Sequence, residues 1–217
     1  MKESPKRFTR EKIFDPATEK SLVTTRGLEA AIEYLGISEK DLEGKEVLDI
    51  GSGNAHLAQE LSKKGVKVYS VDAYLKPHEP IASPADLTPR FGEGSYEDAK
   101  SRAVLGLAEH LPFKDESFDL VISLFAVPYY SPNEENLEQE LREMVRVLKP
   151  GGEIQLAPVF MYALLNKSNS SDRENAWHVM QVASRVIPSI PDCVFETEPY
   201  KEKVLTQRLI IRKRKTN

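Results

Sequence analysis

Two aspartates and a glycine-rich turn are the residues of this 217-residue chain best suited to binding a charged small molecule. Asp49 precedes a turn that contains Gly51, Ser52 and Gly53. Glycines allow a backbone to approach a ligand closely, and the free N–H groups at the start of a following helix attract an anion. The Asp49 carboxylate can bind a cation at the same place. The turn therefore favours a ligand with both an ammonium and a carboxylate group, as at the end of an amino acid.

Asp72 adds a second feature to this ligand. It follows Gly51 by 21 residues, and in dinucleotide-binding folds an acidic residue about 20 residues beyond the first glycine binds ribose hydroxyls. A ribose beside an amino acid points to S-adenosylmethionine. A nicotinamide dinucleotide is disfavoured, because His56 replaces the third glycine of the G-x-G-x-x-G fingerprint and Asp49 would repel a pyrophosphate. A tight turn without any ligand is the other alternative.

The residues around the turn have the pattern of a strand–helix–strand unit. Residues 46–50 form an apolar run that predicts a buried strand, 56–64 predict a helix that ends at Gly65, and 67–71 predict a second strand. Such a unit within about 25 residues is typical of a parallel sheet. Asp72 then stands at the end of the second strand.

Further strands are expected at 103–107, 118–124, 153–157, 194–197 and 205–213. The connection between the last two is too short for a parallel crossover, so these two strands should be antiparallel. Together the elements predict an α/β fold, a Rossmann-like three-layer sandwich with a seven-stranded, mostly parallel sheet and an antiparallel last strand.

Three more helices are predicted from caps and apolar spacing. One spans 16–35, with Leu28, Ala31, Ile32 and Leu35 on one face and Gly36 as its end. A second begins in the capping box Ser131-Pro-Asn-Glu134 and ends at the turn 149–152. A third begins near Ser171.

The chain is predicted to form one domain over 15–217, preceded by a flexible, polar segment at 1–14. The stretch 73–94 contains four prolines and two glycines, and a loop of that length inside a compact domain is usually functional. We expect the loops 73–94 and 158–172 to form the walls of an acceptor site.

Composition limits the classes of function. The formal net charge is −4, which gives no overall attraction to nucleic acid, and the basic run 212–215 is interpreted as a solvated tail. No apolar run approaches the roughly 18 residues that a membrane span needs. Cys193 is the only cysteine, so an intrachain disulfide and C-x-x-C metal spacings are absent, and no metal is expected. We expect a cytoplasmic protein.

Three ordered motifs resemble the class I S-adenosylmethionine-dependent methyltransferases, in their small-molecule, methyltransferase type 11-like branch. The segment 47–55 resembles the first motif of that family. Residues 108–113, followed by 117–121, are similar to the adenine-side and fourth-strand segments, and 141–152 resemble the helix and turn before the fifth strand. The matches occur in family order over about half of the chain.

The resemblance implies a set of cofactor contacts. Asp49, Gly51, Ser52 and Gly53 would hold the methionine end of S-adenosylmethionine, Asp72 would bind the ribose hydroxyls, and Ala73 would pack on the adenine. The other implied residues are Ala108, whose backbone would contact the adenine edge, its neighbour Glu109, and Ser123, which would lie near the methionine amino group.

Two positions depart from the family pattern. Leu107 stands where the family often has an aspartate that binds the adenine amino group. Losing that hydrogen bond costs on the order of 1 kcal/mol, which weakens binding by about tenfold or less. Ala55 replaces the third glycine of the first motif.

The expected reaction is direct, in-line methyl transfer, in which the protein mainly positions a nucleophile. No catalytic base is assigned. Tyr129 and Tyr130 follow the fourth strand and are candidates for lining the acceptor pocket, with simple packing as the alternative. The expected acceptor is a small molecule, with nucleic acid and membrane partners disfavoured. An RNA or protein methyltransferase, or a module that binds S-adenosylmethionine without catalysis, are the competing interpretations.

Overall fold

The structure is a computed structural model that describes residues 27–53, 55–73, 101–128, 131, 133–161, 181, 184–200 and 206–215. These residues form a seven-stranded sheet in the order β3-β2-β1-β4-β5-β7-β6. The strands are β1 (Glu46–Ile50), β2 (Lys67–Asp72), β3 (Ala103–Leu105), β4 (Phe118–Leu124), β5 (Leu148–Met161), β6 (Cys193–Tyr200) and β7 (Thr206–Lys213).

The strand directions confirm the predicted topology. β1 pairs in parallel with β2 on one side and with β4 on the other, and β3 and β5 continue the parallel sheet outward. β7 lies between β5 and β6 and is antiparallel to both. The strand order reverses between β1 and β4, and open α/β sheets bind their ligands at the carboxyl ends of the strands at such a reversal.

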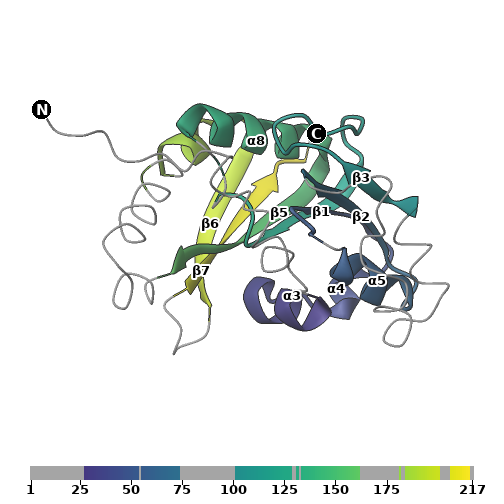
Figure 1. Cartoon of the computed structure of the whole chain (residues 1–217). Coiled ribbons are helices and arrows are strands. Elements are labelled where there is room, and N and C mark those ends of the chain that lie inside the picture. The colour runs from purple at the N-terminus through teal and green to yellow at the C-terminus, as the bar shows by residue number, and fades with distance from the viewer. Residues whose placement is uncertain are drawn as a thin grey trace, which may run out of the picture.

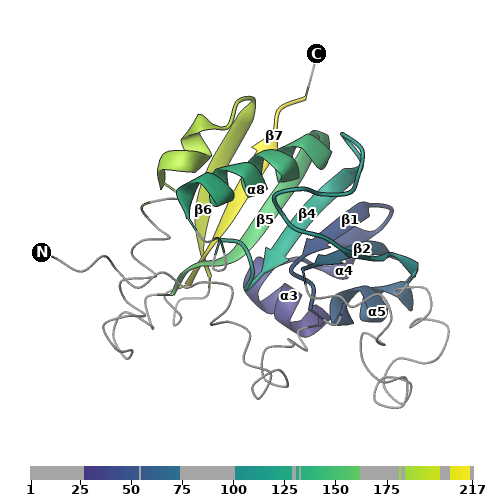
Figure 2. The same cartoon turned by 45° about the horizontal axis from the view of Figure 1, so that its top comes forward.

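Helices cover both faces of the sheet, as Figures 1 and 2 show. On one face lie α3 (Leu28–Leu35), α4 (Glu39–Leu42) and α5 (His56–Ser62), and on the other lies α8 (Glu134–Val147). A short 3-10 helix, η1 (Ile187–Ser189), precedes β6. The predicted three-layer arrangement is therefore confirmed.

Each face of the sheet has its own apolar core. Leu35, Leu57 and Leu61 from α3 and α5 pack with Val47 and Ile122 of the sheet. On the opposite face, inward residues of α8 pack against β1, β4 and β5, and these are Leu137, Leu141, Met144 and Val147. Strand residues alternate between the two cores, as the twofold repeat of a strand requires. The two cores fix β1 and β4, the strands between which the strand order reverses.

The first helix differs from the prediction in one respect. α3 ends at Gly36, whose left-handed backbone (φ 64°) closes the helix as expected. Ala31 and Leu35 are buried as predicted, but Ile32 is 46% exposed, so its assignment to the inward face was wrong. The start of this predicted helix, at 16–26, lies outside the described residues.

The cap of α8 is a second correction. Asn133, not Ser131, is the N-cap, and its side-chain oxygen accepts a hydrogen bond from the Asn136 N–H at 2.9 Å. Ser131 instead donates its hydroxyl hydrogen to the buried carboxylate of Glu140. The capping-box spacing placed the helix start too early because both residue types serve equally well as caps.

The sheet also differs from the prediction at the start of β5 and at the end of β3. The predicted turn at 149–152 belongs to β5, which begins at Leu148 opposite Phe118 and has a register irregularity before Leu120 pairs with Glu153. The third strand ends at Leu105, and Leu107 forms only an isolated bridge to His110. Most of the helix expected after Ser171 lies outside the described residues.

The basic run at the end of the chain is only partly a solvated tail. Arg212 pairs with Glu153 and Glu196 on the neighbouring strands. Lys213 donates to the carbonyl oxygens of Val145 and Leu148, at 3.2 and 2.8 Å. These two residues are therefore part of β7, and the interpretation of the whole run as a free tail was wrong.

Candidate functional site

The turn after β1 is held against the end of β2. The Gly51 and Ser52 N–H groups both donate to the carbonyl oxygen of Val71, at 2.8 and 3.3 Å. Gly51 has φ 73°, and a Cβ added there would lie 2.1 Å from the Cβ of Ala126. Only glycine suits this position, because the loop after β4 comes so close to the turn.

Asp72 meets the same turn from the end of β2. Its carboxylate accepts a hydrogen bond from the Gly53 N–H at 2.8 Å. The glycine turn and Asp72, which were linked in the sequence by their spacing alone, are thus in direct contact. The Gly53 N–H and the Asp72 carboxylate thus face one another at the carboxyl edge of the sheet.

Asp49 is a buried carboxyl group close to this contact. It lies in β1, next to the last residue of the strand, and only 5% of its surface is exposed. Burial, and to a smaller extent the nearby charge of Asp72, together raise the pKa of Asp49 from 3.8 to about 7. The edge therefore carries two carboxyl groups with different environments, one buried and one half-buried, which a bound cation would stabilise.

The two predicted serines have different surroundings. The Ser123 hydroxyl donates to the Ile50 carbonyl oxygen at 3.0 Å and accepts from the Val127 N–H at 2.9 Å. It thereby ties the end of β1 to the loop after β4. The Ser52 hydroxyl oxygen is buried and has no hydrogen-bond partner among the described residues. A buried hydroxyl without a partner is costly unless a ligand supplies one.

The predicted adenine segment lies beside the end of β2. The Gly106 N–H donates to the carbonyl oxygen of Asp72 at 3.2 Å, and Leu107 and His110 close a turn around Ala108. The buried carboxylate of Glu109 accepts from the side-chain amide of Asn136 on α8 at 3.1 Å. Ala73, directly after Asp72, is exposed.

The structure therefore brings most of the predicted cofactor residues to one edge of the sheet. Asp49, the turn 51–53, Asp72 and Ala73 lie at the ends of β1 and β2, and Ser123 lies near the end of β4. Tyr129 and Tyr130, most of the loop 73–94 and most of 158–172 lie outside the described residues. Their assignment to the acceptor site stays a prediction.

Two features of this edge could not be found by sequence reasoning. Ala55, at the start of α5, and Phe125, directly after β4, have left-handed backbones with φ 52° and 58°. Such a conformation costs a residue other than glycine about 1 kcal/mol or more. The close approach of Ala126 to Gly51 is likewise invisible in the sequence, because it depends on the register between β1 and β4.

The described residues contain neither a metal-binding cluster nor a membrane-spanning helix. No group of three or more His, Cys, Asp or Glu side chains among them could hold a metal ion. None of the helices in this part of the chain has the length and apolar character needed to span a membrane.

A seven-stranded sheet of this order, with a glycine turn and two carboxyl groups at its carboxyl edge, defines a Rossmann-like α/β protein. Residues 48–156 match the family model described as "Methyltransferase domain". This match covers half of the chain, and the chain belongs to that family of class I S-adenosylmethionine-dependent methyltransferases.

Relatives named as methyltransferases agree with this assignment. A demethylmenaquinone methyltransferase of Corynebacterium efficiens is 29% identical over 152 residues, which cover 69% of this chain and 56% of the relative. A sterol 4-C-methyltransferase of Caenorhabditis elegans is 27% identical over 63% of this chain and 36% of the relative. The chain thus spans about half the length, or less, of these relatives.

Similar solved structures show the same fold at low sequence identity. A Methanococcus maripaludis protein described as a putative S-adenosylmethionine-dependent methyltransferase superimposes with a TM-score of 0.55 at 20% identity, covering 100% of this chain and 99% of that one. A Pyrococcus horikoshii protein gives a TM-score of 0.57 at 20% identity, covering 93% and 100% of the two chains.

Proposed function

We propose that this chain transfers the methyl group of S-adenosylmethionine to a small-molecule acceptor by direct in-line displacement. The observation that carries the proposal is the contact between the Gly53 N–H and Asp72, beside the buried Asp49. A carboxylate for ribose hydroxyls, a buried acid for a cation and the buried Ser52 hydroxyl lie together at the edge where the family binds its cofactor.

The residues present fit S-adenosylmethionine. Asp49 would pair with the ammonium group, whose charge offsets the burial that keeps its pKa high. The buried Ser52 hydroxyl, which has no partner among the described residues, would gain one from the methionine end. Asp72 would accept hydrogen bonds from the ribose hydroxyls, and Ala73 and the backbone of Ala108 would contact the adenine.

When bound, S-adenosylmethionine supplies an electrophilic methyl group on a sulfonium sulfur. Transfer of this methyl group to an electron pair of the acceptor would leave S-adenosylhomocysteine as the second product. The protein's contribution is orientation. Ser123 fixes the loop after β4 against the end of β1, so residues that follow this loop, including Tyr129 and Tyr130, are proposed to line the acceptor pocket.

A small molecule is the acceptor class that these observations favour. The named relatives act on demethylmenaquinone and on a sterol. The interpretation as an RNA methyltransferase loses its main support, because Arg212 and Lys213 of the basic run are engaged within the sheet and against α8. We also propose a cytoplasmic location, since the single cysteine of this sequence, Cys193, allows no intrachain disulfide.

Calorimetric titration with S-adenosylmethionine and S-adenosylhomocysteine tests the cofactor site. We expect micromolar binding that Asp72→Ala weakens by tenfold or more, a loss of about 1.4 kcal/mol. Asp41→Ala is the matched control, because this aspartate lies on α4 before the amino end of β1. Folded wild-type protein that binds neither ligand would overturn the proposal. Binding without methyl transfer to any quinone precursor, sterol or other small molecule would favour a non-catalytic binding module.

A further inference from the structure

Helix α8 has a polar stripe beside its buried apolar face. Asn136, Gln139, Glu143 and Arg146 are spaced by three, four and three residues, which places them on one side of the helix. Each of the four side chains contacts the irregular segment 107–117, which carries the adenine-side residues Ala108 and Glu109. The stripe therefore runs along the segment rather than toward solvent.

The contacts follow the segment in order. The Asn136 amide reaches the Glu109 carboxylate at 3.1 Å, and the Gln139 amide lies 3.3 Å from the His110 ring nitrogen. One turn further on, the Glu143 carboxylate accepts the Leu111 N–H at 2.9 Å. Successive residues of the segment are thus matched by successive turns of the helix.

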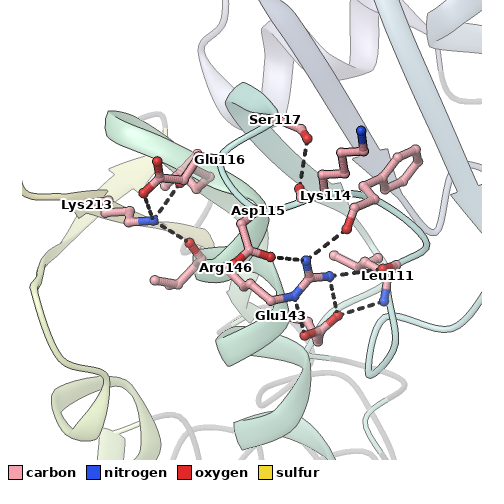
Figure 3. A network of polar contacts seen from close by, with 11 residues as sticks. Leu111, Lys114, Asp115, Glu116, Ser117, Glu143, Arg146 and Lys213 are labelled. Atoms are coloured by element: carbon pink, nitrogen blue, oxygen red, sulfur yellow. Dashed lines mark hydrogen bonds and ion pairs between the residues drawn. The ribbon is translucent and has the colours of Figure 1, made fainter.

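Arg146 makes the last contacts in this series between α8 and the segment, as Figure 3 shows. Its guanidinium donates to the carbonyl oxygens of Leu111 and Phe113, at 3.0 and 2.8 Å. It also pairs with Glu143 at 2.7 Å and with Asp115 at 2.8 Å. The planar, multiply donating guanidinium suits this task, whereas a lysine ammonium would act as a point charge.

These contacts replace the hydrogen bonds that a strand would have given the segment. Beyond the bridge between Leu107 and His110, the backbone of 108–113 has no sheet partner among the described residues. Backbone polar groups that leave water need partners, and here α8 supplies them to Leu111 and Phe113. The conformation of the segment is consequently set by the helix.

We propose that Glu143 and Arg146 are positioning residues for adenine recognition. They act through the backbone of 107–113 and hold the Ala108 N–H where it can donate to N1 of the adenine ring. This inference rests on the proposed function, because it assigns the adenine to this segment. It adds that the preference for adenine over other nucleobases depends on side chains of α8 that contact the segment 107–113 and do not contact the ligand themselves.

The test compares S-adenosylhomocysteine with S-inosylhomocysteine. N1 of hypoxanthine carries a hydrogen, so an N–H group held toward it faces another donor, and wild-type protein should bind this analogue about tenfold more weakly. Arg146→Ala should weaken S-adenosylhomocysteine binding about tenfold and reduce the preference between the two ligands to about twofold or less. A variant that only loses stability would bind both ligands with the wild-type ratio.

Arg142→Ala is the matched control, since Arg142 lies four residues earlier on α8 and pairs with Glu138. This variant should keep the wild-type ratio of the affinities for S-adenosylhomocysteine and S-inosylhomocysteine. If Arg146→Ala does not fold, Glu143→Gln, which removes the charge opposite Arg146, should show the reduced ratio instead. An unchanged ratio in a folded variant overturns the inference while wild-type binding upholds the proposed function. Wild-type protein that binds neither ligand overturns both, and equal wild-type binding of the two ligands overturns the inference alone.

Discussion

At the scale of single residues, Asp49 is an ionisable carboxyl group in a buried environment that disfavours its charged form. A carboxyl group in an apolar interior is stable when protonated, and burial raises the pKa of Asp49 from 3.8 to about 7. The folded chain therefore keeps a proton that the unfolded chain releases between these two values. The contribution of Asp49 to stability is full below pH 3.8 and is lost as the pH rises through about 7.

Asp49→Asn should consequently stabilise the ligand-free protein at pH 8 and impair ligand binding. We expect a gain of about 1 to 3 kcal/mol in the free energy of unfolding at pH 8, which shrinks as the pH falls to 5. Binding of S-adenosylhomocysteine should weaken by about tenfold or more, because the ammonium group loses its partner. Denaturant unfolding at both pH values, combined with calorimetry, measures the two effects.

Asp119 provides a control, because its pKa is shifted in the opposite direction to that of Asp49. Burial alone would raise the pKa of Asp119, but hydrogen bonds from Lys149 and from the Glu46 N–H outweigh it and lower the pKa. The stability that Asp119 contributes is present at neutral pH and lost in acid. Asp119→Asn should therefore destabilise the protein at pH 8. A stabilising effect of both substitutions would contradict this account of Asp49.

At the scale of elements, the start of α8 decides how the adenine segment and the loop after β4 meet. Asn133 caps the helix, Asn136 in the first turn holds Glu109, and Glu140 accepts the hydroxyl hydrogen of Ser131. A shift of the helix start would move both contacts together. The cap is therefore expected to matter for stability and for the order of the site.

Asn133→Ala should lower the free energy of unfolding by about 1 kcal/mol, because the Asn136 N–H loses its acceptor. Asn133→Asp should restore wild-type stability, since an aspartate caps equally well and its charge favours a helix N-terminus. Urea unfolding of the three proteins measures this. Equal stability of wild type and Asn133→Ala would show that the cap lies elsewhere.

Elements with a strong local signal were predictable from the sequence, and tertiary details were not. The run 46–50 and the glycines at 51 and 53 specify a buried strand and a tight turn by composition alone. The choice between Ser131 and Asn133 as cap, and the entry of 149–152 into β5, depend on contacts with Glu140 and Phe118 that are distant in the sequence. The exposure of Ile32 is a property of packing that a helical repeat does not determine.

The same division applies to the site. Asp49, Asp72 and the turn were predictable because the distance between the first glycine and the second acid reflects the geometry of a strand–helix–strand unit. The roles of Ser123 as a link between β1 and the loop after β4, and of Arg146 as an anchor of the adenine segment, were not. Both depend on atoms brought together from separate parts of the chain.

At the scale of the whole molecule, the distribution of charge separates a small-molecule enzyme from one that acts on RNA. The net charge is −4, and the basic residues that end β7 are paired. Arg212 contacts Glu153 and Glu196, and Lys213 contacts Glu116 at 3.4 Å as well as two carbonyl oxygens. Few basic groups of this run are left to displace counterions from a phosphate backbone.

We therefore expect RNA to bind no more tightly than about 100 µM at physiological salt, which is at the weak end of non-specific association. Fluorescence anisotropy with a labelled transfer RNA at about 50 and 200 mM salt measures this, with S-adenosylhomocysteine present to occupy the cofactor site. Reversing the charge of Arg214, which is exposed at the end of the run, should change neither RNA binding nor cofactor binding. Micromolar RNA affinity that falls steeply with salt, and that Arg214→Glu abolishes, would instead identify a nucleic-acid substrate and contradict the small-molecule assignment.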